Sequence, residues 1–201
     1  IEGEAEQRSS KSPTPETIAD HWALSVLQHS TLKITSLLEE FRISEAYDLL
    51  YHMVWDQIAD WYIEASKHGA GHGILEYILV TILKLAHPFA PFVTEAIYQT
   101  IKPNELLAST QWPEIISYNT TKANEFTKII KIVTEVRQLT KNLKLSKPVL
   151  LFEKSNLLKD NALLVAKLAN INKLEQRSNP VGIRLINASA YLEIDQKHLQ
   201  D

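Results

Sequence analysis

Basic side chains are concentrated between residues 122 and 154, a segment with eight lysines and arginines against three acids. Its apolar residues recur every three or four positions, which predicts a long helix. Five basic residues fall mainly off that apolar stripe: Lys128, Lys131, Arg137, Lys141 and Lys144. Cations at helical spacing can contact a phosphate backbone, so these five are our candidates for nucleic-acid binding. The alternative is an ordinary solvated helix face, because most surface helices carry charges there.

Acidic side chains gather in a different segment, residues 39–64, which holds seven acids and a single arginine. Asp56, Asp60 and Glu64 recur at every fourth position and so line one edge of a helix. Paired carboxylates can bind a metal ion or transfer protons. A polar edge that solubilises the helix, or that pairs with the basic segment, is the simpler interpretation. His68 and His72 are too loosely placed among glycines to add a metal pair, so we predict neither a metal site nor a catalytic residue.

Tryptophans offer a second route to nucleic acid, because single-stranded bases stack on aromatic rings. Trp22, Trp55 and Trp61 occur at helical spacing among leucine and isoleucine. This setting is more typical of packing in the core or at its rim than of a stacking surface.

Composition excludes several classes of function. The 201 residues include no cysteine, so no disulfide or thiolate metal site can form, and the cytoplasm is the default compartment. The five glycines do not form any of the usual glycine-rich phosphate loops. The net charge of −3 makes any basic surface local. No apolar run approaches the roughly 20 residues of a membrane span, and we predict no membrane partner.

Apolar periodicity predicts a mainly α protein, a helical bundle followed by a small α/β appendage. We expect a flexible lead-in at residues 1–18, the bundle at 19–146 and the appendage at 147–201. The second helix, residues 46–62, is apolar on more than one face and is predicted to lie in the centre of the bundle. The expected helices span 19–41, 46–62, 74–86, 91–101, 124–143 and 156–169, and the expected strands span 149–153, 171–176, 181–186 and 190–194.

Two sequence runs resemble the anticodon-binding region of valyl-tRNA synthetases, a class I aminoacyl-tRNA synthetase family. Residues 56–67 read D-Q-I-A-D-W-Y-I-E-A-S-K, and residues 85–95 read L-A-H-P-F-A-P-F-V-T-E. Shorter matches at 19–22, 54–55, 111–113 and 133–137 extend the resemblance over roughly residues 19–195. Related isoleucyl and leucyl enzymes share a similar region, and the run Asp60-Trp61-Tyr62-Ile63-Glu64 favours valine.

The resemblance implies a bundle that docks the anticodon stem and loop of a valine-accepting tRNA. The complete enzyme would activate valine with ATP and Mg²⁺, using catalytic and editing domains upstream, so this chain is expected to bind no cofactor and to be inactive alone. The family's preceding helix and its C-terminal coiled-coil arm have no counterpart here. The run Lys144-Leu145-Ser146-Lys147-Pro148 superficially resembles the family's K-M-S-K-S loop, but it follows a bundle helix instead of a nucleotide-binding sheet.

Three alternatives stay open on the sequence. The chain could be the corresponding domain of an isoleucyl or leucyl enzyme. It could be a helical protein-interaction scaffold without RNA binding, in which acidic and basic segments pair or dock a partner. It could also be a metal-dependent hydrolase that uses Asp56, Asp60, Glu64 and a histidine.

Overall fold

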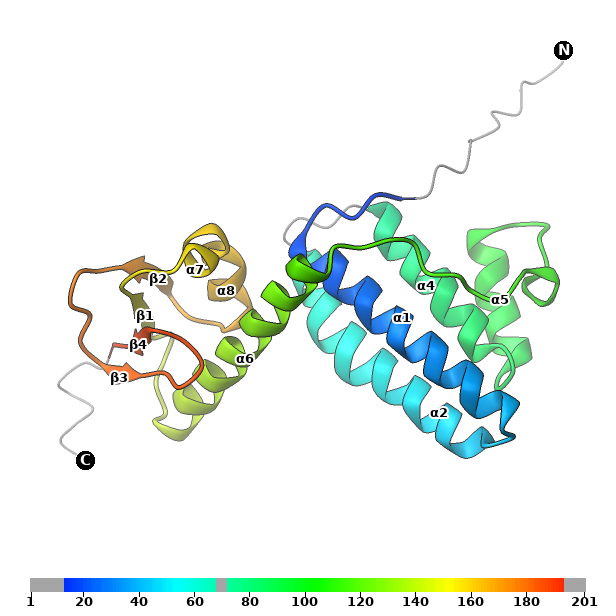
Figure 1. Cartoon of the computed structure of the whole chain (residues 1–201), viewed down its shortest axis with the longest axis horizontal. Coiled ribbons are helices and arrows are strands. Elements are labelled where there is room, and N and C mark those ends of the chain that lie inside the picture. The colour runs from blue at the N-terminus through cyan, green and yellow to red at the C-terminus, as the bar shows by residue number, and fades with distance from the viewer. Residues whose placement is uncertain (1–12, 68–71, 194–201) are drawn as a thin grey trace, which may run out of the picture.

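The computed structural model of the chain describes residues 13–67 and 72–193. A helical bundle occupies the first part, and a four-stranded sheet with two short helices, here called the sheet unit, occupies residues 149–193. Helix α6 (Thr120–Asn142) runs from the bundle to the sheet unit (Figure 1). The predicted mainly α fold with a small α/β appendage is therefore confirmed. Residues 1–12 of the expected lead-in and His68 lie outside the described residues.

Helix α1 (Ile18–Glu39) is the centre of the bundle and packs against α2, α4, α6 and η1 (Figure 1). It begins with a capping box in which Thr17 and Asp20 each bind the other's backbone amide. Asp20 is fully buried and also accepts a 2.8 Å hydrogen bond from the hydroxyl of Tyr62. Burial, together with this bond to Asp20, raises the pKa of Tyr62 far above its ordinary value, so the phenol remains a donor.

The second helical segment lies at the edge of the bundle, so the prediction that it occupies the centre is wrong. It comprises α2 (Ile43–His52), the π-helix η1 (Met53–Ile63) and the short α3 (Glu64–Ser66). Ala46 and Leu50 are buried against the bundle, whereas Tyr47, Tyr51 and Trp55 are exposed on the other side. Because α1 already fills the centre, one of the two apolar faces has no helix to cover it in the described structure.

Two further helices complete the bundle, α4 (His72–Ala86) and α5 (Pro91–Ile101), and the 3-10 turn η2 (Leu107–Ser109) follows them. The predicted break between these helices is confirmed. Pro91 occupies the first turn of α5, where its missing amide leaves no hydrogen bond unmade. Within the described residues, none of the helices combines the length and the apolar character that a membrane span requires.

The sheet unit is built on a four-stranded sheet in the order β2-β1-β4-β3, with β2 parallel and β4 antiparallel to β1. The predicted helix 156–169 is divided at Asn161, whose side-chain amide donates to the carbonyl oxygen of Leu157 and competes with helix continuation. The elements are β1 (Val149–Phe152), α7 (Asn156–Asp160), α8 (Ala162–Leu168), β2 (Lys173–Gln176), β3 (Ile183–Arg184) and β4 (Ala190–Leu192).

Most buried apolar side chains of the bundle and of the sheet unit belong to one continuous core, and Leu83, Tyr98 and Leu107 form a smaller separate cluster. Helix α6 makes this continuity possible because it packs against α1 in the bundle and against α8 in the sheet unit. Phe126, Ile129 and Val133 recur at three and four positions along its buried face. The polar face of α6 is therefore held in a fixed relation to both parts of the molecule.

Candidate nucleic-acid interface

The five basic residues chosen from the sequence all lie on α6 or just after it, and all are exposed. They do not form a single row. Lys128 and Arg137 are nine residues apart, about two and a half turns, so they lie on opposite sides of the helix. Lys141 and Lys144 continue on the side of Arg137, one turn at a time. The structure thus separates Lys128 and Lys131, called here the outer pair, from the other three.

A cleft of about 490 Å³ opens between the end of α6 and the turn that follows α8. Arg137, Lys141 and Lys144 line it, and so do Lys147 and Asn170. No acidic side chain is among its lining residues. We call this site, with these five residues, the basic cleft.

The turn after α6 gives the basic cleft its shape. Helix α6 ends in a Schellman motif, in which the Leu145 amide donates to the Thr140 carbonyl and the Lys144 amide to the Lys141 carbonyl. Lys144 occupies the position in this motif where glycine is usual, with φ of 50°. Lys147 has φ of 47°. A side chain in this left-handed region costs about 1 kcal/mol, so two lysines stand where the backbone favours glycine.

Arg137 also links the bundle to the sheet unit. Its Nε donates a 2.8 Å hydrogen bond to the carbonyl oxygen of Leu168, at the end of α8. Its guanidinium carbon lies 5.1 Å from the centre of the Trp61 ring, which belongs to η1. Arg137 therefore links its own helix α6 to α8 and η1 and fixes one wall of the basic cleft, while its Nη groups make no hydrogen bond to another described residue.

Glu135, on the same helix, fastens the turn between β3 and β4. Its carboxylate accepts hydrogen bonds from the amides of Ile186 and Asn187, at 2.6 and 3.0 Å, and from the Asn187 side chain at 2.8 Å. Partial burial would raise the pKa of Glu135, but these hydrogen bonds outweigh it and hold the pKa below its ordinary value. The carboxylate thus has its own partners and does not line the basic cleft.

Of the three acidic candidates, Asp56 and Glu64 have partners close by in the chain, whereas Asp60 is exposed and makes no ion pair with any described residue. Asp56 lies 2.7 Å from Nδ1 of His52, and Glu64 lies 2.6 Å from Nζ of Lys67. In the part of the chain that the structure describes, no ion pair joins this segment to α6. Nor do three or more side chains able to ligate a metal come together within residues 13–67 and 72–193. The hydrolase alternative therefore has no assembled ligand set there.

The three tryptophans have different environments. Trp22 is only 8% exposed, and its ring centre lies 5.2 Å from that of Phe126, which confirms its role in the core. Trp61 packs beneath Arg137. Trp55 is 61% exposed and stacks on Tyr51, with ring centres 6.5 Å apart. Core packing therefore accounts for Trp22, whereas Trp55 lies on the surface.

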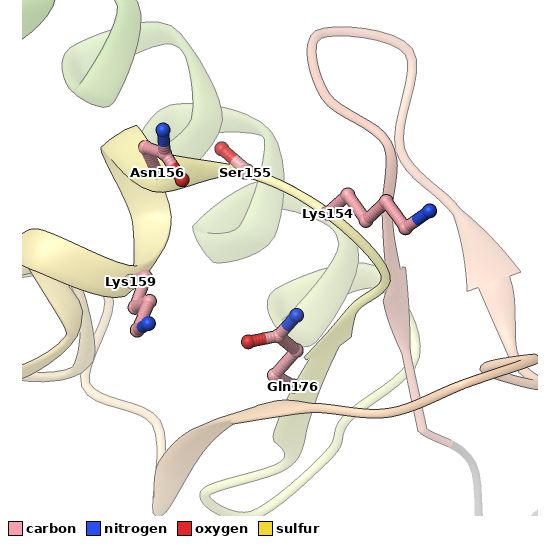
Figure 2. Close-up of a pocket in the computed structure, with 5 residues that line it drawn as sticks. All are labelled: Lys154, Ser155, Asn156, Lys159 and Gln176. Carbon is pink, nitrogen blue, oxygen red and sulfur yellow. The ribbon is translucent and has the colours of Figure 1, made fainter.

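A second hollow, of about 380 Å³, lies within the sheet unit. Figure 2 shows Lys159 and the amide of Gln176 extending toward its middle, whereas Lys154 points away from both. Gln176 donates its side-chain amide to the backbone oxygen of Glu153, and Ser155 caps α7. Its polar groups thus stabilise the local fold, and its two lysines, Lys154 and Lys159, point in different directions.

Sequence reasoning missed two residues of the basic cleft. Lys147 belongs to the run 144–148, which resembles the K-M-S-K-S loop only superficially because it does not follow a nucleotide-binding sheet. The useful signal was its charge, since the run adds lysines directly after a basic helix. Asn170 gives no comparable signal, because only the packing of α8 against α6 brings it to the cleft.

Comparison with known proteins places this architecture in a family. Residues 20–152 match the family model described as the anticodon-binding domain of tRNA ligase. That range contains the bundle, all of α6, the turn after it and β1.

Curated relatives agree with this match. The valine–tRNA ligases of Geobacillus kaustophilus (strain HTA426) and Enterococcus faecalis (strain ATCC 700802 / V583) are 33% and 34% identical over 179 residues, which is 82% of this chain and 20% of theirs. The valine–tRNA ligase of Mycolicibacterium paratuberculosis is 36% identical over 130 residues, 61% of this chain and 15% of its own. The chain thus spans about a fifth of the length of the first two relatives. Together with the match over residues 20–152, these similarities show that the chain belongs to the family of anticodon-binding domains of tRNA ligases.

Proposed function

We propose that this chain binds the anticodon stem and loop of tRNA as part of a longer valine–tRNA ligase. The observation that carries the proposal is the family match over residues 20–152, which includes α6 and the turn at the basic cleft. The names of the relatives favour valine over isoleucine or leucine as the amino acid of the complete enzyme.

In the complete protein, the ATP- and Mg²⁺-dependent formation of valyl-tRNA belongs to catalytic and editing domains upstream in the same polypeptide. This chain contributes RNA binding and no reacting group. We place the complete enzyme in the cytoplasm, where translation uses its product. Residues 19–146 form the anticodon-binding bundle in this proposal, and residues 147–201 form the appendage that follows it.

Binding relies on the shape of the RNA, on contacts to phosphates and on stacking of unpaired loop bases. The candidates for phosphate contact are Lys128, Lys131, Arg137, Lys141 and Lys144, all of them exposed, and only the last three line the basic cleft. A lysine that neutralises a phosphate releases a counterion, so each one lost lowers the salt dependence of binding by about one unit of slope.

The test is the affinity of the purified chain for tRNA over a range of salt concentrations, compared with bulk RNA of similar length. We expect tighter binding to tRNA and a steep salt dependence. Equal affinity for tRNA and bulk RNA would contradict anticodon-arm recognition. A complete lack of RNA binding would support the protein-interaction scaffold instead.

Valine specificity has its own comparison. Valine-accepting tRNA is compared with a variant that differs only in the anticodon, and with tRNAs for isoleucine and leucine. We expect the valine tRNA to bind most tightly. A preference for another of these tRNAs would assign the chain to a different tRNA ligase.

A further inference from the structure

We propose that the basic cleft is a subsite for phosphates of the RNA backbone, built jointly by the end of α6 and the sheet unit, and that the outer pair takes no part in it. The inference rests on the proposed function and deepens it, because it names the part of the RNA that this site takes. It adds Lys147 and Asn170 to the candidate phosphate contacts and leaves Lys128 and Lys131 outside this subsite.

The electrostatic balance of the basic cleft favours an anion. Four side chains with full positive charges line it, from Arg137, Lys141, Lys144 and Lys147. Opposing them are the carbonyl ends of α6 and α8, each equivalent to about half a negative charge. Within the described residues, none of the three lysines makes an ion pair. The cleft therefore keeps a net positive charge without a partner on the protein.

Directional donors accompany this charge. The guanidinium of Arg137 is held by Leu168, and its Nη groups, which bond to no other residue in the described part of the chain, suit the fork geometry of a phosphate. Asn170 lies on the opposite wall, in the left-handed position that ends α8, with φ of 53°. The hydroxyl of Thr140, in the wall, makes no hydrogen bond within the described residues.

The backbone conformation of Lys144 and Lys147 also supports a binding role for their side chains. Both residues adopt positive φ, where glycine would remove the steric cost. Residues kept in such conformations are often retained for what their side chains do. Here both side chains extend the same cationic surface from one short turn.

A purely structural account of these lysines makes a different prediction. Lysines near the end of a helix stabilise it by opposing its dipole. If that is their only role, substitution of these lysines would lower the melting temperature. The affinity for RNA would then equal that of any other variant with the same net charge.

The decisive experiment compares two triple variants with the same charge change. K141Q/K144Q/K147Q removes the cleft lysines, and K122Q/K128Q/K131Q removes three exposed lysines from elsewhere on α6. Glutamine has the same backbone cost as lysine at positive φ, so the turn is preserved. With valine tRNA, we expect the cleft variant to lose at least about tenfold in affinity and about three units of salt slope, and the control to lose less than about threefold.

A glycine variant separates the two accounts of Lys144. K144G relieves the positive φ, so we expect an equal or higher melting temperature together with weaker tRNA binding. A lower melting temperature with unchanged binding would support the structural account and overturn the subsite.

Protection of lysines from acetylation maps the contact on the unmodified chain. Bound tRNA is expected to protect Lys141, Lys144 and Lys147 and to leave Lys128 and Lys131 reactive. Equal losses in the two triple variants, or protection of the outer pair alone, would overturn the inference while tRNA binding itself stands. Failure of the unmodified chain to bind tRNA would instead reject the proposed function.

Discussion

The bundle and the sheet unit are held to their neighbours by different kinds of polar contact. In the bundle, Asp20 joins the start of α1 to Tyr62 through a buried hydrogen bond, and the largely buried His21 accepts a 3.0 Å, partly buried hydrogen bond from the Asn119 amide at the start of α6. The sheet unit is fastened to the later part of α6 by Arg137 and Glu135, whose contacts are closer to solvent. Helix α6 also packs more extensively against α1 than against α8, so its attachment to the bundle is tighter than its attachment to the sheet unit.

This difference has a consequence for binding. A water-accessible hydrogen bond contributes less to stability than a buried one, because water competes for its groups. The basic cleft lies at the more weakly fastened end of α6, between two parts of the molecule. We therefore expect the bundle to act as the rigid scaffold and the junction to open first.

The largest expected effect comes from Asp20. D20A removes the Asp20 half of the capping box and leaves the buried Tyr62 hydroxyl without its acceptor, so we expect a loss of about 3 kcal/mol in the free energy of unfolding. Y62F, the matched control, removes a single hydroxyl and should cost about 1 kcal/mol. Urea denaturation measures both. If D20A lowers the free energy of unfolding no more than Y62F does, the buried contacts of Asp20 stabilise the bundle no more than one hydrogen bond would.

Arg137 should have a smaller and more local effect. R137A removes the hydrogen bond to Leu168 and the contact with Trp61, which together amount to about 1 to 2 kcal/mol. Hydrogen exchange should accelerate at amides of the sheet unit and remain slow in α1. R137K keeps the charge and serves as the control for electrostatic effects. Equal acceleration in α1 would show that the junction is not the weaker part.

His21 provides the smallest expected effect, a dependence of stability on pH. Burial, followed by the charge of Lys122, lowers the pKa of His21, and Nδ1 must be unprotonated to accept from Asn119. The folded chain therefore binds fewer protons at this site than the unfolded chain, whose histidine pKa is about 6.5. Stability from this group is complete above that pH and is lost as the pH falls through the lowered folded pKa.

Urea midpoints measured between pH 7.5 and pH 5 test this sign. We expect the midpoint of the unmodified chain to fall on acidification more than that of H21Q, which keeps an acceptor but cannot titrate. The other histidines are the same in both proteins and so cancel in the comparison. Parallel curves for the two would remove His21 as a pH-sensitive part of the bundle.

Local patterns determined most of the elements. The break between α4 and α5 follows from Pro88 and Pro91, and the change from helix to strand after residue 148 follows from a change in apolar period. These features depend on residues within a few positions of each other. Family membership was also accessible from the sequence, through the runs at 56–67 and 85–95.

Only the tertiary structure determines which face of each helix is buried, which is exposed and which lines the basic cleft. Tyr47, Tyr51 and Trp55 are as apolar as buried residues, and only the central position of α1 leaves them exposed. On charge alone, Lys128 and Lys141 are equivalent candidates. Their positions around α6, together with the packing of α8 against α6, place only Lys141 in the basic cleft. The sequence states which residues can bury or bind, but the partners of a face come from distant parts of the chain, so only the folded molecule shows which residues meet.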